Sequence, residues 1–353
     1  MKQINIIGGI AGISGYDSHT RNLANALDRI IPVRLSCQIP QGFELQLTDR
    51  EVTMLKRKPH ADEINLIITM PHMWRLYTTN KRNWAYCIWE GDKVPESFIP
   101  EFLNTDIEYI FVPSNHTKQA IINTNSDNRI TNKIKIIPHG VNPDLFFSKE
   151  KPKKCTFIAN KGFRNLEDRG GIQYLIKAYL EEFNETDNVE LILKINPTYG
   201  IVDLNQAIKQ LTNKTGKTAT IKIDVNAYDY KKMAQLYNQG NVFVSTTRAE
   251  AYNLPCIEAM ICGLPVLTTN FGGQTDYVDN DNGWIIGGEI KPVEHEVAYE
   301  GISWLEPSIE ELRAKLRHIY ENPEEVENKS IRAMETAIHH TWYDTAELIE
   351  TFI

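Results

Sequence analysis

The chain has 353 residues, of which 42% are hydrophobic and 24% are charged, close to the averages for soluble globular proteins. This composition argues against intrinsically disordered and membrane-spanning classes, and the formal net charge of -8 argues against a dominant nucleic-acid-binding surface. At about 150 residues per domain, the length predicts two domains, each large enough to bury a core.

Apolar runs alternate with longer amphipathic stretches along the chain, a pattern typical of parallel sheets with crossover helices. Strands are predicted, in chain order, over residues 4–9, 64–70, 109–114, 134–140, 154–160, 189–195, 220–224, 241–246 and 264–269. Helices are predicted over 170–183, 308–320, 323–340 and 341–353. The predicted fold class is therefore α/β, with two doubly wound, Rossmann-like domains.

A basic, proline-containing stretch from Ser148 to Lys154 separates the two series of strands. We therefore expect a first domain over residues 1–150 and a second over 151–335, followed by a terminal segment over 336–353.

The amino terminus passes from a short apolar run directly into a glycine loop, unlike a signal peptide, and no apolar run reaches the roughly 18 residues of a membrane helix. The cysteines are scattered, with no C-x-x-C pair, as is typical of reduced thiols. They are Cys37, Cys87, Cys155, Cys256 and Cys262. These features predict a cytoplasmic protein.

The stretch RAEAYNLPCIEAM, residues 248–260, places Glu250 and Glu258 on either side of a predicted helix start. Pro255 suits the first helical turn and Gly263 suits the carboxyl-terminal end. The amino terminus of a helix attracts phosphate, and nearby carboxylates accept hydrogen bonds from vicinal hydroxyls. The pattern therefore indicates a nucleotide-sugar site. The alternative is that Glu258 only complements the helix dipole and Glu250 is solvated.

The longer segment STTRAEAYNLPCIEAMICGLPVLTTNFGGQTDYVDNDNGWII, residues 245–286, resembles the signature of family 4 of the retaining nucleotide-sugar glycosyltransferases. That signature is a Glu, seven residues, a second Glu, a small-residue helix, a Gly-x-Pro-Val strand and a Gly-Gly turn. The resemblance extends to WEGDKVPESF, FVPSNHTKQAI, IKIIPHGVNPDLF and FRNLEDRGGIQYLIKAY, and covers most of the chain. It implies the GT-B fold, with two Rossmann-like domains facing a cleft and a final helix that crosses back to the first domain.

The resemblance also assigns roles around the glutamate pair. Glu258 would bind the nucleotide ribose, and Glu250 would contact the donor sugar or the reacting face. Backbone amides would bind the diphosphate, and they belong to Ala251, Tyr252, Asn253 and Leu254. The family often has Gly where this chain has Ala251 and Asn253.

Cations are expected near the diphosphate, because its departure builds negative charge that a guanidinium or ammonium group stabilises. The resemblance places Arg164 and Arg169 in this role, and Lys194, at the end of a predicted strand, is a further candidate. The alternative for each is an ordinary surface cation. We expect a reaction without metal, because the resemblance requires none and no histidine cluster with ligand spacing argues for one.

Two features of the first half complete the expected site. The glycine loop over residues 8–15 contains Gly12 and Gly15, which resemble the family's first loop near the donor phosphates; NAD, FAD or tight packing are the alternatives. His72 follows the strand predicted over 64–70 and resembles a histidine on the acceptor side, although a lone histidine is more often structural.

The resemblance therefore predicts a retaining hexosyltransferase that moves a sugar from a UDP-, GDP- or ADP-sugar to a hydroxyl of a glycan, lipid-linked or protein acceptor. No cofactor and no nucleic acid are expected. The cationic runs 56–58 and 149–154 are interpreted as solvated surface, with weak peripheral membrane contact as the alternative. Other functions on this scaffold are a sugar-nucleotide epimerase, a glycan phosphorylase or a non-catalytic nucleotide- or sugar-binding protein.

Overall fold

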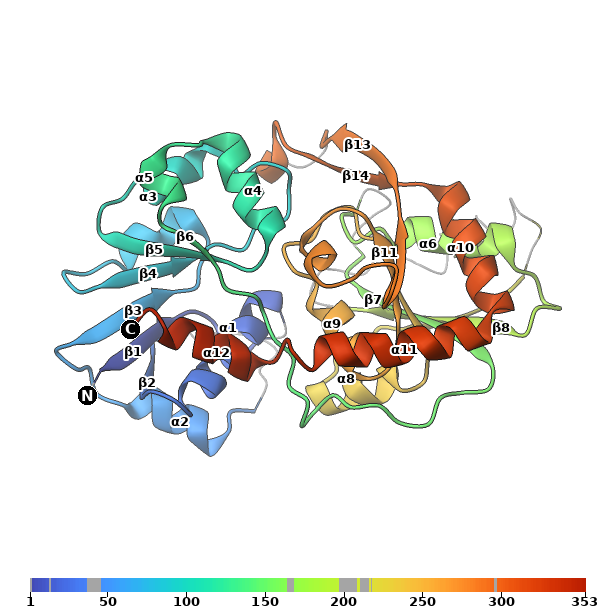
Figure 1. Cartoon of the computed structure of the whole chain (residues 1–353), viewed down its shortest axis with the longest axis horizontal. Coiled ribbons are helices and arrows are strands. Elements are labelled where there is room, and N and C mark those ends of the chain that lie inside the picture. The colour runs from blue at the N-terminus through green and yellow to red at the C-terminus, as the bar shows by residue number, and fades with distance from the viewer. Residues whose placement is uncertain are drawn as a thin grey trace. The chain divides into compact units, whose positions relative to one another are not determined.

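The computed structural model describes residues 2–12, 14–36, 46–163, 168–196, 208–209, 216, 218–294 and 297–353. The chain forms two compact units (Figure 1). The first contains Met1–Gly140, Glu296–Ile302 and His340–Ile353, and the second contains Val141–His295 and Ser303–His339. The division after Gly140 lies ten residues before the boundary expected from the sequence at residue 150.

The first unit is built on a parallel six-stranded sheet with the order β2-β1-β3-β4-β5-β6. Its strands are β1 Gln3–Ile7, β2 Val33–Ser36, β3 Glu63–Ile67, β4 Asn83–Tyr86, β5 Ile107–Val112 and β6 Ile134–Ile136. Its helices are α1 Gly15–Leu27, α2 Asp49–Lys56, α3 Ile99–Phe102, α4 Asn115–Thr124, α5 Asn128–Thr131 and α12 Trp342–Glu350, with 3₁₀ turns over Pro71–Leu76, Glu96–Phe98 and Val297–Tyr299. The sequence did not predict β2 and β4, which have only four residues each.

The terminal helix α12 lies beside α1 in the first unit (Figure 1). Its first residue, Trp342, is buried, and the hydroxyl of Thr345 donates to the carbonyl oxygen of Pro138 at 2.9 Å. The backbone of this helix passes so close to Gly140 that a Cβ there would lie 2.2 Å from the Trp342 nitrogen. This close approach requires glycine.

The second unit has a parallel six-stranded sheet with the order β12-β11-β10-β7-β8-β9. Its strands are β7 Cys155–Lys161, β8 Val189–Ile195, β9 Thr220–Asp224, β10 Val242–Ser245, β11 Val266–Thr269 and β12 Gly283–Ile286. An antiparallel pair, β13 Gly288–Pro292 and β14 Ser303–Pro307, follows. Numbered within the unit, the parallel strands have the dinucleotide-binding order 3-2-1-4-5-6, which changes direction between β7 and β10.

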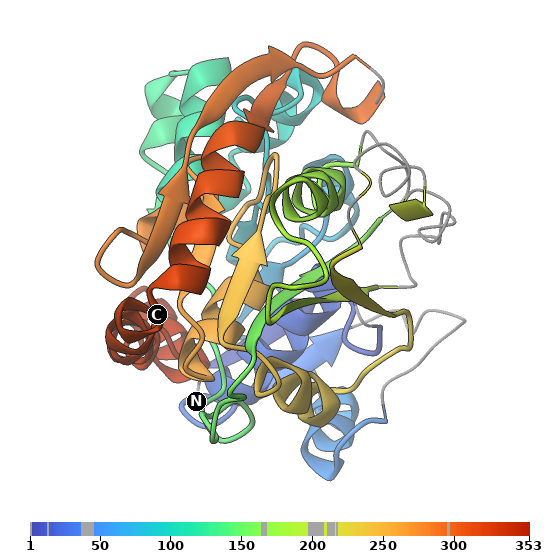
Figure 2. The same ribbon diagram turned by 90° about the vertical axis from the view of Figure 1, so that its right-hand side faces the viewer.

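Helices cover both faces of this second sheet. They are α6 Ile172–Glu182, α8 Tyr230–Tyr237, α9 Leu254–Ile261, α10 Ile309–Glu321 and α11 Pro323–Ala337, with a 3₁₀ turn over Gly273–Asp276. Because strand residues alternate between faces, Phe157 packs into the core under α6 and α10, and Ile158 packs into the core under α8, α9 and α11. Figure 2 shows α6 and α10 side by side.

The structure confirms the α/β class, the nine predicted strands and the four predicted helices, within a few residues at each end. Among the helices of the described ranges, none combines the length and the apolar character that crossing a membrane requires.

Candidate active site

The glutamate motif lies in the second unit, at the carboxyl ends of β7 and β10. Glu250 is in the loop between β10 and α9, and Lys161 is the last residue of β7. In sheets of this kind, ligands bind outside the carboxyl ends of the strands where the strand order changes direction, which here is between these two strands.

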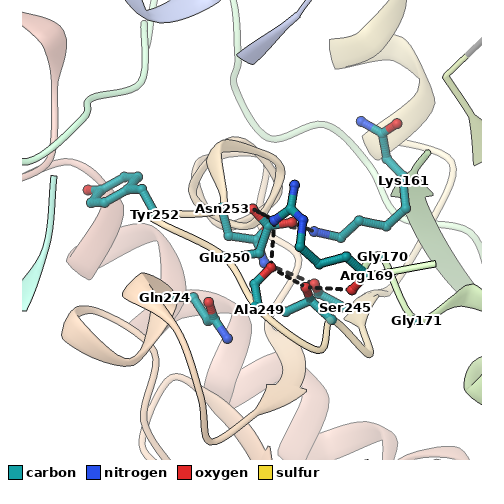
Figure 3. Close-up of polar contacts among 12 residues, drawn as sticks. Lys161, Arg169, Gly170, Gly171, Ser245, Ala249, Glu250, Tyr252, Asn253 and Gln274 are labelled. Carbon is teal, nitrogen blue, oxygen red and sulfur yellow. Dashed lines mark hydrogen bonds and ion pairs between the residues drawn. The ribbon is translucent and has the colours of Figure 1, made fainter. Parts of the chain in front are cut away.

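The Lys161 side chain bridges Glu250 and Asn253 (Figure 3). Its Nζ lies 2.9 Å from Oε1 of Glu250 and 2.8 Å from Oδ1 of Asn253. The Lys161 side chain is only 6% exposed, against 20% for Glu250. A buried ammonium group is stable only when it is paired and hydrogen-bonded, so Glu250 and Asn253 together hold this cation in place.

Arg169 approaches the same carboxylate from the turn before α6. Its guanidinium donates to the carbonyl oxygen of Ala249 at 2.6 Å and lies 3.7 Å from Oε2 of Glu250. Burial by itself would raise the pKa of Glu250, but the charges of Lys161 and Arg169 lower it below its ordinary value. The site therefore contains two cations around one ionised carboxylate.

The turn that carries Arg169 is held against the end of β10. The hydroxyl of Thr246 donates to the carbonyl oxygen of Gly171 at 2.8 Å, and the amide of Arg248 donates to the carbonyl oxygen of Arg169 at 2.9 Å. Gly171 has φ +73°, and a Cβ there would lie 1.8 Å from the Thr246 oxygen. Glycine is required at this position both for conformation and for space.

Asn253 precedes α9 in the left-handed conformation, with φ +72°, and within the described ranges it is the one non-glycine residue with positive φ. Asn tolerates this region better than most residues. Its side-chain amide donates to Oγ of Ser245 at 2.9 Å, while its Oδ1 faces Lys161. The side chain makes no capping hydrogen bond to α9, whose amino terminus lies next to the two cations.

The segment after β11 packs against the loop between β10 and α9. The amide of Gly273 donates to the carbonyl oxygen of Glu250 at 2.7 Å, and a Cβ on Gly272 would lie 2.8 Å from the same oxygen. The hydroxyl of Tyr277 lies 2.8 Å from the carbonyl oxygen of Tyr252. The Gly-Gly turn of the motif therefore allows the close packing that fixes the loop.

Ala251 and Tyr252 are buried in this loop, and Leu254 is the first residue of α9. Tyr252 points away from the cations in Figure 3 and contacts the ring of Tyr277, with 5.0 Å between centroids. Their burial fixes the backbone of this loop, whose amides the resemblance assigns to the diphosphate.

Glu258 is the fifth residue of α9. Its Oε2 accepts a hydrogen bond of 2.9 Å from the hydroxyl of Tyr237, the last residue of α8. Burial raises the pKa of Glu258 to about 7, and the hydrogen bond from Tyr237 opposes this rise. The two glutamates of the motif are thus electrostatically different, one kept ionised by cations and one with a pKa near neutrality.

This difference predicts opposite effects of Glu→Gln substitutions on stability. Because the pKa of Glu258 is raised, its protonated form contributes stability. This contribution is fully present below about pH 4.5 and is lost as the pH rises through about 7. We expect E258Q to be more stable than the wild type at pH 8 by about 1–2 kcal/mol, with the difference vanishing near pH 5.

E250Q is the matched comparison. Because the pKa of Glu250 is lowered in the fold, its ionised carboxylate contributes stability above its ordinary pKa, and this contribution is lost on acidification. E250Q should therefore be less stable than the wild type at pH 8. Urea unfolding between pH 4.5 and 8.5 measures both effects. Equal responses of the two variants would contradict the assigned environments.

The other predicted cations are placed differently. Arg164 lies outside the described residues. Lys194 is buried near the end of β8, where its Nζ donates to the carbonyl oxygen of Ile195 at 3.0 Å and lies 5.0 Å from the ring centre of Tyr228. Burial lowers the pKa of Lys194, and Asp224 opposes this shift.

The predicted residues of the first half belong to the first unit. The amide of Gly12 donates to Oδ1 of Asp17 at 3.2 Å, and Gly15 is the first residue of α1. A Cβ on Gly12 would lie 2.5 Å from Asp17, whereas one on Gly15 would meet no atom within 4 Å. His72 is exposed in the turn Pro71–Leu76 that follows β3.

Sequence reasoning missed Lys161 and Tyr237. The available signal for Lys161 was its place at the end of a predicted strand, where site residues of such sheets collect. No local pattern marks Tyr237, because its partner Glu258 lies 21 residues away on another helix. Within the described part of the chain, no group of three or more His, Cys, Asp or Glu side chains is arranged to hold a metal.

The chain was compared with known proteins. The probable sucrose-phosphate synthase of Thermosipho melanesiensis is 28% identical over 159 residues, which are 43% of this chain and 36% of that relative. The match therefore spans only part of the relative's length.

Solved structures show the GT-B fold over the whole chain. The sucrose-phosphate synthase of Thermosynechococcus elongatus matches with a TM-score of 0.72 and 15% identity, over 100% of this chain and 98% of that one. Anabaena HepE, solved in complex with UDP and glucose, matches with a TM-score of 0.68 and 15% identity, over 99% of this chain and 98% of that one.

The family model described as "Glycosyl transferases group 1" matches residues 142–335, more than half of the chain and the whole of the site built around the glutamate pair. The chain therefore belongs to the family of glycosyl transferases group 1.

Proposed function

We propose that this protein is a retaining glycosyltransferase, which moves a hexosyl group from a nucleoside-diphosphate sugar to a hydroxyl acceptor. The observation that carries the proposal is the convergence of Lys161 and Arg169 on Glu250, next to the amino terminus of α9. Two cations beside a helix amino terminus form a site suited to a diphosphate.

The proposed reaction builds negative charge on the oxygen that links the sugar to the diphosphate. Lys161, whose side chain is mostly buried, and the partly exposed Arg169 stabilise this charge. Glu250 orients both cations and faces the donor sugar. The amides from Ala251 to Leu254 bind the phosphate oxygens, as the resemblance to family 4 implies.

Glu258 accepts hydrogen bonds from the ribose hydroxyls in this proposal. It lies on α9 one turn beyond the helix start, whereas the two cations lie beside Glu250 in front of that helix. Retention of configuration proceeds without a protein nucleophile when the departing diphosphate accepts the acceptor's proton on the same face of the sugar. Catalysis then depends on positioning and charge stabilisation, with no metal required.

The first donor to test is a UDP-sugar, because the structurally similar Anabaena protein was solved with UDP and with UDP-glucose. GDP- and ADP-sugars are the other candidates. The acceptor is a hydroxyl of a glycan, a lipid-linked sugar or a protein. We assign His72 of the first unit to the acceptor side, and the loop of Gly12 and Gly15 to the donor phosphates.

We expect one nucleoside diphosphate to raise the melting temperature of the wild type and to lose this effect in E258A. A ligand at about 100 times its dissociation constant stabilises a protein by roughly 2.7 kcal/mol. The measurement is a thermal shift with UDP, GDP, ADP and NAD at pH 8. A rise in melting temperature with NAD alone, or no rise with any of the three nucleoside diphosphates, would contradict the proposed donor site.

Turnover separates the proposal from the other functions on this scaffold. A glycosyltransferase releases nucleoside diphosphate from the matching donor and releases more when acceptors are added. A phosphorylase instead requires inorganic phosphate and forms sugar phosphate, and a sugar-nucleotide epimerase inverts a stereocentre of the donor sugar without transferring that sugar to an acceptor. Binding without any of these products would identify a non-catalytic protein.

A further inference from the structure

A chain of hydrogen bonds runs through the second unit to Glu258. The side-chain amide of Asn160 donates to the hydroxyl oxygen of Tyr237 at 3.3 Å, and the Tyr237 hydroxyl donates to Oε2 of Glu258 at 2.9 Å. Tyr237 is completely buried, packed against Phe146 and Phe243 with ring centroids 6.1 and 5.7 Å away. Its hydroxyl therefore has a fixed position.

Asn160 and Lys161 are the last two residues of β7, and their side chains point to opposite faces of the sheet. Lys161 holds Glu250 directly, and Asn160 holds Glu258 through Tyr237. The end of one strand thus anchors both glutamates of the motif, each from a different face of the sheet.

We propose that Tyr237, supported by Asn160, is a positioning residue that orients the Glu258 carboxylate and keeps it ionised for nucleotide binding. This inference rests on the proposed function, in which Glu258 binds the ribose. Oε2 of Glu258 accepts the hydrogen bond from Tyr237, so Oε1 is the carboxylate oxygen that accepts hydrogen bonds from the ribose hydroxyls.

The direction of these hydrogen bonds follows from the chemistry of the groups. Burial and the nearby Glu258 charge raise the pKa of Tyr237 well above its ordinary value, so it remains protonated and can only donate its single hydroxyl proton to the carboxylate. Removing this donor would take away the hydrogen bond that favours the ionised form of Glu258, whose pKa should then rise above about 7.

Cys256, Cys262 and Lys151 are other titratable groups in the surroundings of Glu258. Burial raises the pKa values of the Cys256 and Cys262 thiols to about 12, so neither titrates between pH 5.5 and 9. Burial lowers the pKa of Lys151, whose ammonium donates to the carbonyl oxygen of Cys262, to about 8. E258Q removes the contribution of Glu258 to the pH dependence of binding and leaves that of Lys151. Its pH profile is therefore the background against which the other variants are compared.

The test is the dissociation constant of the nucleoside diphosphate that shifts the wild type, measured by calorimetry from pH 5.5 to 9. We expect wild-type affinity to rise with pH and to level off above the pKa of Glu258. In Y237F the midpoint should move up by about one pH unit, which weakens binding at pH 6.5 about tenfold and restores it near pH 9.

The matched control is Y179F, which removes another buried hydroxyl of the second unit, one that donates to the carbonyl oxygen of Thr220 at 3.0 Å. It should lower thermal stability without moving the pH midpoint. N160A should move the midpoint in the same direction as Y237F but by less, and it provides the test if Y237F does not fold.

Wild-type pH midpoints in Y237F and N160A, with diphosphate binding intact, would overturn the role of Tyr237 and leave the proposed function standing. An affinity loss in Y237F that is equal at every pH would also overturn it, because a merely structural defect behaves in this way. If the wild type binds no nucleoside diphosphate, the proposed function fails and this inference fails with it.

Discussion

Replacing Lys161 with Met is expected to lower the turnover of the nucleotide-sugar donor by about 10²–10³-fold, the usual effect of removing one preorganised group that stabilises transition-state charge. The variant keeps the length and apolar stem of the side chain but removes its charge. Among the described residues, Arg169 then remains as the cation beside Glu250, at 3.7 Å. The measurement is the rate of nucleoside diphosphate release at saturating donor.

K161M should also destabilise the fold by about 1–3 kcal/mol, because it leaves the mostly buried Glu250 with a weaker set of partners. Adding E250Q should recover much of this loss, since the uncompensated carboxylate is then neutral, but it should not restore turnover. K161R keeps the charge and is expected to retain more activity than K161M. Near-normal turnover in folded K161M would exclude Lys161 from the proposed site.

The second large effect is expected for Gly171→Ala, which should cost about 3 kcal/mol or more of unfolding free energy. The left-handed conformation at φ +73° by itself costs about 1 kcal/mol for a residue with a side chain. The new Cβ would also lie 1.8 Å from the backbone oxygen of Thr246, so the turn carrying Arg169 must move away from β10. Donor turnover should fall as well, because Arg169 moves with the turn.

Gly216→Ala is the matched control, since Gly216 has φ +68° in the same unit and a Cβ there meets no atom within 4 Å. It should show only the conformational cost of about 1 kcal/mol and no change in turnover. Chemical denaturation of both variants separates the two contributions. Equal stability losses would mean that the close packing of Gly171 against Thr246 is unimportant.

Local patterns were sufficient for much of the fold. An apolar run with the right length and punctuation located β8 at its observed bounds, because buried parallel strands are rich in apolar residues. The helix after Glu250 was predicted from its apolar spacing, Pro255 and Gly263, and Gly263 indeed follows α9 with φ +78°. The strands β2 and β4 were missed, because only two of the four residues in Val33–Ser36 are apolar and the run Asn83–Tyr86 begins with a polar residue.

The candidate site could be predicted only in part. The glutamate pair and Arg169 were identified from one continuous motif and from the resemblance it carries. Lys161 was missed because its importance comes from contacts with Glu250 and Asn253, which lie 89 and 92 residues away along the chain. Lys161 is the last residue of β7 and Lys194 is the last but one of the neighbouring β8, and only the strand order places Lys161 next to β10.

The sequence by itself determined that this protein has two α/β units, and that its glutamate motif lies at a helix start after a buried strand. These features depend on periodicity, caps and turns, which act over a few residues. Only the tertiary structure decided that the end of β7 holds both glutamates, with Lys161 beside Glu250 and Asn160 behind Tyr237 and Glu258. Charge pairing and desolvation depend on distance in space, and spacing along the chain does not reveal that distance.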